Sequence, residues 1–120
     1  MRLLPVVAIL AGSFLAPAYG ATPWCTLESR PSVVVTINDA SGNPQPNASV
    51  SFTIDGGPVQ QAESYCWQEP CNEWWAGEEQ EGLFTITAVG TDGTNVTGQV
   101  QVVREDRCHI HTENMTLVLP

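Results

Sequence analysis

Short runs of β-branched and alternating apolar residues, separated by turn residues, constrain this chain more than any other feature. Residues 32–38 are β-branched almost throughout, and within 48–54 the side chains of Val50, Phe52 and Ile54 fall on one face. Alternation of period two predicts strands, and no segment carries the apolar stripe of a helix. We predict strands at 32–38, 48–54, 59–66 (weaker and polar), 83–89, 96–103 and 114–119, with an irregular acidic segment at 69–82. About seven short strands predict an all-β sandwich or open barrel.

The first twenty residues, MRLLPVVAILAGSFLAPAYG, have the features of a secretory signal peptide. Arg2 gives a positive start, an apolar run follows, and Ala18 and Gly20 place small residues at a cleavage site. The run is shorter than the roughly 20 residues that a spanning helix needs, so we expect no membrane insertion. Residues 1–20 are therefore predicted to be removed, leaving 21–120 as one domain that is secreted or lies in the periplasm or cell envelope.

The four cysteines that follow the signal peptide predict two disulfides, because an even count in a small exported chain is typical of a disulfide framework. Cys66 and Cys71 are separated by four residues that include a proline, which favours a local pair. Cys25 is then expected to pair with Cys108. This spacing is not the C-x2-C of redox or zinc motifs, and few cations are present to stabilise a reactive thiolate.

The charge balance excludes several classes of partner. The chain has no lysine, and once Arg2 is removed only three arginines oppose thirteen carboxylates. A surface this negative repels nucleic acids and anionic membranes. Chemistry that depends on a lysine, such as Schiff-base formation, is also excluded.

The stretch RCHIHT contains the two histidines of the chain and raises the question of a metal site. His109 and His111 are two residues apart on a predicted strand, so their side chains would share a face that Glu113 continues. Imidazole suits zinc and copper, but a zinc site needs three or four protein ligands, and no third histidine exists. We therefore expect exposed strand-edge histidines and no metal or cofactor. A small metal- or ligand-binding protein that uses His109 and His111 is the alternative.

The segment from Glu69 to Glu81 combines five carboxylates with two adjacent tryptophans. Calcium binding and paired-carboxylate glycoside hydrolysis are possible uses, but no EF-hand order is present and so small a domain seldom forms a deep cleft. We expect one tryptophan to cap the core, its neighbour to be partly exposed and the glutamates to be solvated. Exposed tryptophans concentrate binding energy, so Trp67, Trp74 and Trp75 are the predicted contacts with a protein or carbohydrate partner.

Two further kinds of motif are weak or missing. N-x-S/T sequons occur at Asn47, Asn95 and Asn114, and we interpret them as accidental products of threonine-rich strands rather than as glycosylation sites. Neither a G-x-S-x-G nucleophile motif nor a glycine-rich phosphate loop is present. We therefore expect a protein that is not an enzyme.

Three pieces of the sequence resemble carboxypeptidase regulatory-like domains, which are transthyretin-like sandwiches. They are the hairpin SVVVTINDASGNPQPNASVSFTIDGG, the piece WWAGEEQEGLFTITAVG and the ending VVREDRCHIHTENMTLVL, which resembles small exported bacterial versions. The resemblance covers residues 32–119 and implies an Ig-like or transthyretin-like β-sandwich. It also implies a non-enzymatic role as an accessory, adhesion or folding module, and we expect a structural or interaction module.

Overall fold

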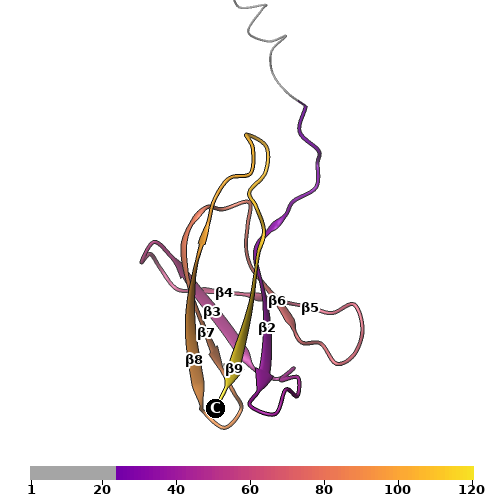
Figure 1. Ribbon diagram of the computed structural model, residues 1–120, viewed down its shortest axis with the longest axis vertical. Helices are drawn as coiled ribbons and strands as arrows, with labels where there is room; N and C mark the ends of the chain where they lie inside the picture. The colour runs from indigo at the N-terminus through magenta and orange to yellow at the C-terminus, as the bar shows by residue number, and fades with distance from the viewer. Residues whose placement is uncertain (1–23) are drawn as a thin grey trace, which may run out of the picture.

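The computed structural model describes residues 24–120, so the predicted signal peptide, 1–20, lies outside the described residues. Residues 24–120 form eight strands and no helix, arranged as two four-stranded sheets (Figure 1). The first sheet has the order β5-β6-β2-β9 and the second β4-β3-β7-β8. The prediction of an all-β sandwich is confirmed. The strands are β2 (Pro31–Asp39), β3 (Ser49–Ile54), β4 (Gln60–Gln61), β5 (Glu63–Tyr65), β6 (Glu73–Glu78), β7 (Gly82–Val89), β8 (Asn95–Val102) and β9 (Glu113–Leu119).

Strand β2 is central to the first sheet. It pairs antiparallel with β6, where Val35 lies opposite Trp74, and parallel with β9, where Val35 lies opposite Met115. The last strand is therefore part of the sheet, as its alternating sequence predicted. In the second sheet, β3 and β8 flank β7 in antiparallel register, with Phe52 opposite Ile86.

The core fills the space between the two sheets with inward residues of β2, β3, β6, β7, β8 and β9 and with Ile110 of the β8–β9 loop. Phe52 and Phe84 stack at its centre, with ring centroids 5.6 Å apart. Each fully buried aliphatic or aromatic side chain contributes about 1.5–3 kcal/mol relative to exposure. The buried apolar residues are Val33, Val35, Ile37, Val50, Phe52, Trp74, Ala76, Phe84, Ile86, Ala88, Val102, Ile110, Leu117 and Leu119.

Two of the expected segments differ from the structure. The predicted strand 59–66 is divided, because β4 pairs with β3 in one sheet and β5 pairs with β6 in the other. The segment 69–82, expected to be irregular, contains strand β6. Its alternation is concealed in the sequence because the inward Trp74 is followed by a second tryptophan, Trp75, on the outward face.

Both predicted disulfides are present. Cys25 and Cys108 are 83 residues apart in sequence, with Cα atoms 5.4 Å apart, and Cys66 and Cys71 close a short loop with Cα atoms 4.8 Å apart. Disulfides in a small domain are typical of an oxidising compartment. Within the described part of the chain, no helix has the length and hydropathy needed to cross a membrane.

Candidate functional site

Three aromatic side chains cluster on and beside the outer face of the first sheet. Tyr65 stacks on Trp75 with ring centroids 4.3 Å apart and an interplanar angle of 17°. Trp67 meets Tyr65 edge-on, at 5.3 Å and 77°. We refer to Tyr65, Trp67 and Trp75 as the aromatic corner.

Strand register places two of these rings side by side. In the pairing of β5 with β6, Glu63 lies opposite Trp75 and Tyr65 opposite Glu73, so Tyr65 and Trp75 are diagonal neighbours on one face. Trp74 points the other way and is 4% exposed in the core. One tryptophan thus caps the core and its neighbour is partly exposed, as expected, but Trp74 is not a surface contact because its side chain is packed between the sheets.

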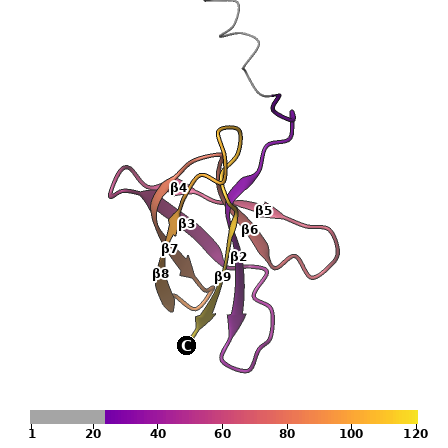
Figure 2. The same ribbon diagram turned by 45° about the horizontal axis from the view of Figure 1, so that its top comes forward.

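Trp67 lies on the loop that joins β5 to β6, which projects from one side of the sandwich (Figures 1 and 2). Its side chain is 79% exposed. The Cys66–Cys71 disulfide closes this loop directly beside Trp67. The indole is therefore held by the disulfide and by its edge contact with Tyr65, although it remains open to solvent.

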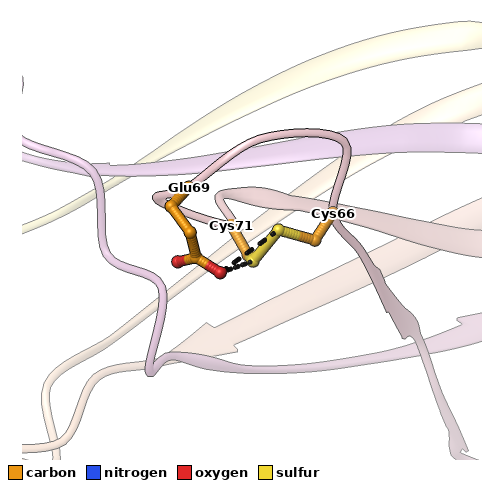
Figure 3. A group of neighbouring side chains, drawn as sticks. All are labelled: Cys66, Glu69 and Cys71. Atoms are coloured by element: carbon orange, nitrogen blue, oxygen red, sulfur yellow. Dashed lines mark hydrogen bonds between the residues drawn. A yellow bond between two sulfur atoms is a disulfide. The ribbon is translucent and has the colours of Figure 1, made fainter.

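Glu69 sits over this disulfide, with Oε2 3.2 Å from Sγ of Cys71 and 3.7 Å from Sγ of Cys66 (Figure 3). Both sulfurs are used in the disulfide and carry no hydrogen, so these contacts are close approaches and not hydrogen bonds. The three residues lie near enough to share a metal ion, but a cysteine binds a metal as its thiolate, and both sulfurs are in the disulfide. In the oxidised protein the group is therefore not a metal site.

A hollow of about 280 Å³ opens beside the aromatic corner. Tyr65, Trp67 and Glu73 contribute to its walls together with polar side chains of β2 and of the loop. Four of the polar side chains make no side-chain hydrogen bond within residues 24–120, and they are Thr36, Tyr65, Gln68 and Glu73. Asn72, in contrast, accepts from the backbone of Gln45 and donates to Asn38.

A second hollow, of about 300 Å³, lies around Trp75. Its polar lining consists of Gln60, Gln61, Glu63, Glu78 and Gln80. The indole Nε1 of Trp75 is shielded from solvent and donates to no acceptor within residues 24–120. Trp75 therefore supports Tyr65 and shapes this hollow through its ring surface and not through its N–H group.

The charges around the corner are negative and uncompensated. Within residues 24–120 the ion pairs of the arginines are Arg30 with Glu28 and Glu105, and Arg104 with Glu81. Glu63, Glu69, Glu73 and Glu78 form no ion pair in that part of the chain. The corner therefore disfavours anionic ligands.

The second cluster joins three distant segments through His109. Nδ1 of His109 lies 2.6 Å from Oε2 of Glu79, and Nε2 lies 2.7 Å from Oγ1 of Thr26. His109 is 6% exposed. It lies in the β8–β9 loop, at the end of the sandwich that the incoming chain reaches (Figure 1).

The ionised state of Glu79 determines which atom carries the proton in its hydrogen bond with His109. Partial burial raises the pKa of the Glu79 carboxyl, but hydrogen bonds from His109 and from the backbone N–H groups of Arg30 and Ile110 outweigh it and hold the pKa below its ordinary value. An ionised carboxylate only accepts hydrogen bonds, so Nδ1 of His109 carries a proton. Nε2 lies within hydrogen-bond distance of the Thr26 hydroxyl, which also donates to Oε1 of Glu28 at 3.2 Å.

This hydroxyl–imidazole–carboxylate order is that of a nucleophile with its base, but the surroundings favour a structural role. An acyl-transfer site needs N–H donors aimed at a developing oxyanion. The backbone N–H groups of Cys108 and His109 already donate to Asp106, and that of Ile110 donates to Glu79. None of the hollows described above includes Thr26 or His109. The cluster therefore fastens the lead-in and the β8–β9 loop to the end of β6.

The expectation that His109 and His111 share one strand face is wrong. Residues 103–112 form a looped hairpin joined by the Arg104–Ile110 bridge, so the period-two rule does not apply. His109 is buried, whereas His111 is exposed and lies 3.3 Å from Glu105. Within residues 24–120, His109, His111 and Glu113 do not converge as a metal-binding group. Both ring nitrogens of His109 are already hydrogen-bonded.

Sequence reasoning missed Tyr65, Thr26 and the role of Glu79. Tyr65 was hidden in a weak polar strand, although its position directly before Cys66 places it beside the stapled loop. Thr26 directly follows Cys25, and His109 directly follows Cys108, so the predicted disulfide already implied that they are close. The contribution of Glu79 had no signal in the sequence.

The three sequons all place their asparagine on the surface, at Asn47, Asn95 and Asn114. Their interpretation as accidental motifs stays a prediction.

Comparison of the chain with known protein families, with curated proteins and with solved structures found no match.

Proposed function

We propose that the protein is a non-enzymatic binding module, secreted or held in the cell envelope, which contacts a protein or carbohydrate partner through the aromatic corner. One observation carries this proposal: Trp67 is 79% exposed, yet it is fixed against Tyr65 on a disulfide-closed loop. The resemblance of residues 32–119 to carboxypeptidase regulatory-like domains, a family with accessory and adhesive roles, is part of this proposal.

A rigid exposed tryptophan favours binding for two physical reasons. Its large ring surface gains free energy when a partner removes it from water. Because the loop is already closed, little conformational entropy is lost when the ring is immobilised in a complex. Tryptophan is accordingly enriched among the residues that dominate interface energies.

The alternative of a metal- or ligand-binding protein built on His109 and His111 has less support. The two side chains bond to different carboxylates, Glu79 and Glu105, and one is buried while the other is exposed. A metal would have to displace a hydrogen bond of His109 to reach either ring nitrogen. We therefore favour the aromatic corner.

The test is binding of fluorescently labelled protein to intact cells and isolated cell envelopes of the producing organism. Trp67→Ala is the decisive variant, and Trp24→Ala is its matched control, because Trp24 is 97% exposed but does not line the hollow. We expect saturable binding by the wild type and Trp24→Ala, and weaker binding by Trp67→Ala. Equal binding by all three proteins would refute the aromatic corner as the contact surface. Lack of binding by the wild type would refute the proposal that the protein is a binding module.

A further inference from the structure

We infer that the aromatic corner binds an uncharged carbohydrate chain, with one sugar ring stacked on Trp67 and hydrogen-bonded in the adjacent hollow. This inference rests on the proposed function and names the ligand class for that surface.

The stacking surface is the indole of Trp67. Tyr65 already has Trp75 stacked on it, and Trp67 touches Tyr65 only edge-on. A pyranose ring has a face of C–H groups, which carry slight positive charge, and an aromatic face is slightly negative. A sugar ring is therefore a complementary partner for an open indole face.

The hollow beside Trp67 supplies the polar contacts. Its volume of about 280 Å³ lies at the lower end of small-ligand sites, which suits a single ring. Thr36 and Tyr65 offer hydroxyls and Gln68 an amide, which can both donate and accept, whereas Glu73 offers a carboxylate, which accepts. Sugar hydroxyls also donate and accept, so they match this mixture.

Charge and donor count separate a sugar from other ligands. Glu69 and Glu73 lack ion-pair partners within residues 24–120, so uronate, sulfate and phosphate groups are repelled. A lysine or arginine side chain would gain from the carboxylates and from a cation–π contact with Trp67. It has no acceptor atoms, however, and would leave the donors of Thr36, Tyr65 and Gln68 unused. An uncharged polyhydroxylated ligand uses both kinds of group.

The second hollow extends the site along the strands. Tyr65 and Glu63 are successive outward positions of β5, and Glu73 and Trp75 are successive outward positions of β6. Such positions are about 6–7 Å apart, so Glu63 and Trp75, which line the second hollow, come directly after Tyr65 and Glu73 on the same face. The second hollow also reaches β3 and β4 of the other sheet. Its lining is again rich in amides, contributed by Gln60, Gln61 and Gln80. A chain of sugars therefore makes more contacts than a single sugar.

The experiment measures depletion of the purified protein by four neutral insoluble polysaccharides: cellulose, xylan, chitin and a β-1,3-glucan. We expect at least one to remove the wild type and Trp24→Ala from solution, with Kd raised about tenfold or more in Trp67→Ala, the loss typical of a dominant tryptophan contact. Titration with soluble oligosaccharides of that polymer, followed by tryptophan fluorescence, should show affinity rising with chain length.

The outcomes separate this inference from the proposed function. Depletion by none of the four polymers, or equal binding to the anionic polymers polygalacturonate and heparin, would overturn the carbohydrate inference. Preference for a lysine-rich peptide, lost in Trp67→Ala, would also overturn it but would support the corner as a contact surface. Polysaccharide binding that Trp67→Ala retains unchanged would overturn both.

Discussion

Glu79 Oε2 lies 2.6 Å from Nδ1 of His109, and this contact joins the end of β6 to the loop before β9. The same carboxylate accepts hydrogen bonds from the backbone N–H groups of Arg30 and Ile110. Nε2 of His109 then reaches Thr26 in the lead-in. One carboxylate therefore organises the end of the sandwich where three segments meet, and its charge state is linked to the stability of that end.

Stability should fall at acidic pH through Glu79. Its pKa in the folded protein is lowered from the ordinary value of 4.5, so its contribution is present above pH 4.5 and is lost as the pH falls through the lowered value. Thermal melting of the wild type and Glu79→Gln between pH 7 and pH 3 measures this. The variant should melt lower at pH 7, and the gap should narrow toward pH 3. A gap that stays constant over this range would contradict the prediction.

The two histidines should differ in their effect on stability. His109→Ala removes one hydrogen bond from the Glu79 carboxylate and one from the Thr26 hydroxyl and opens space at a buried site, which should cost about 1–3 kcal/mol in the free energy of unfolding. His111→Ala removes an exposed side chain and should change it by less than about 0.5 kcal/mol. Urea denaturation measures both. Equal effects would show that His109 is not part of a stabilising cluster.

The two disulfides should contribute unequally. In the chain-entropy model, the Cys25–Cys108 bond closes a long loop worth about 4 kcal/mol and the Cys66–Cys71 bond a short loop worth about 2 kcal/mol. Paired Cys→Ser variants, compared by denaturant unfolding, should therefore rank in that order. The Cys66→Ser/Cys71→Ser protein should stay folded and yet lose affinity at the aromatic corner, because the loop that holds Trp67 is released. Unchanged affinity would show that the disulfide does not preorganise the site.

Substitution of Trp74 should lower the stability of the fold, whereas substitution of Trp67 should affect binding alone. Trp74 is 4% exposed in the core, so Trp74→Ala should destabilise the protein by about 3–5 kcal/mol. Trp67→Ala should leave the unfolding midpoint close to that of the wild type, because its side chain is 79% exposed. Thermal and urea unfolding give both values. A large loss of stability in Trp67→Ala would mean that reduced binding by this variant could not be assigned to the surface.

The sequence by itself determined the fold class, the positions of most strands and both disulfides. It could do so because β-branched alternation and turn residues act locally, and because the spacing of Cys66 and Cys71 left one partner for Cys25. It also determined the sign of the surface charge, which follows from counting ionisable residues.

Only the tertiary structure decided which side chains form sites. The division of residues 59–66 between two sheets placed Tyr65 on Trp75, and the irregular hairpin before β9 buried His109 and exposed His111. The contact of Glu79 with His109 spans thirty residues of sequence. Such contacts arise when the two sheets pack together and the lead-in is joined to the β8–β9 loop. A local sequence pattern records which face a residue prefers, but it does not record which distant residue will lie opposite.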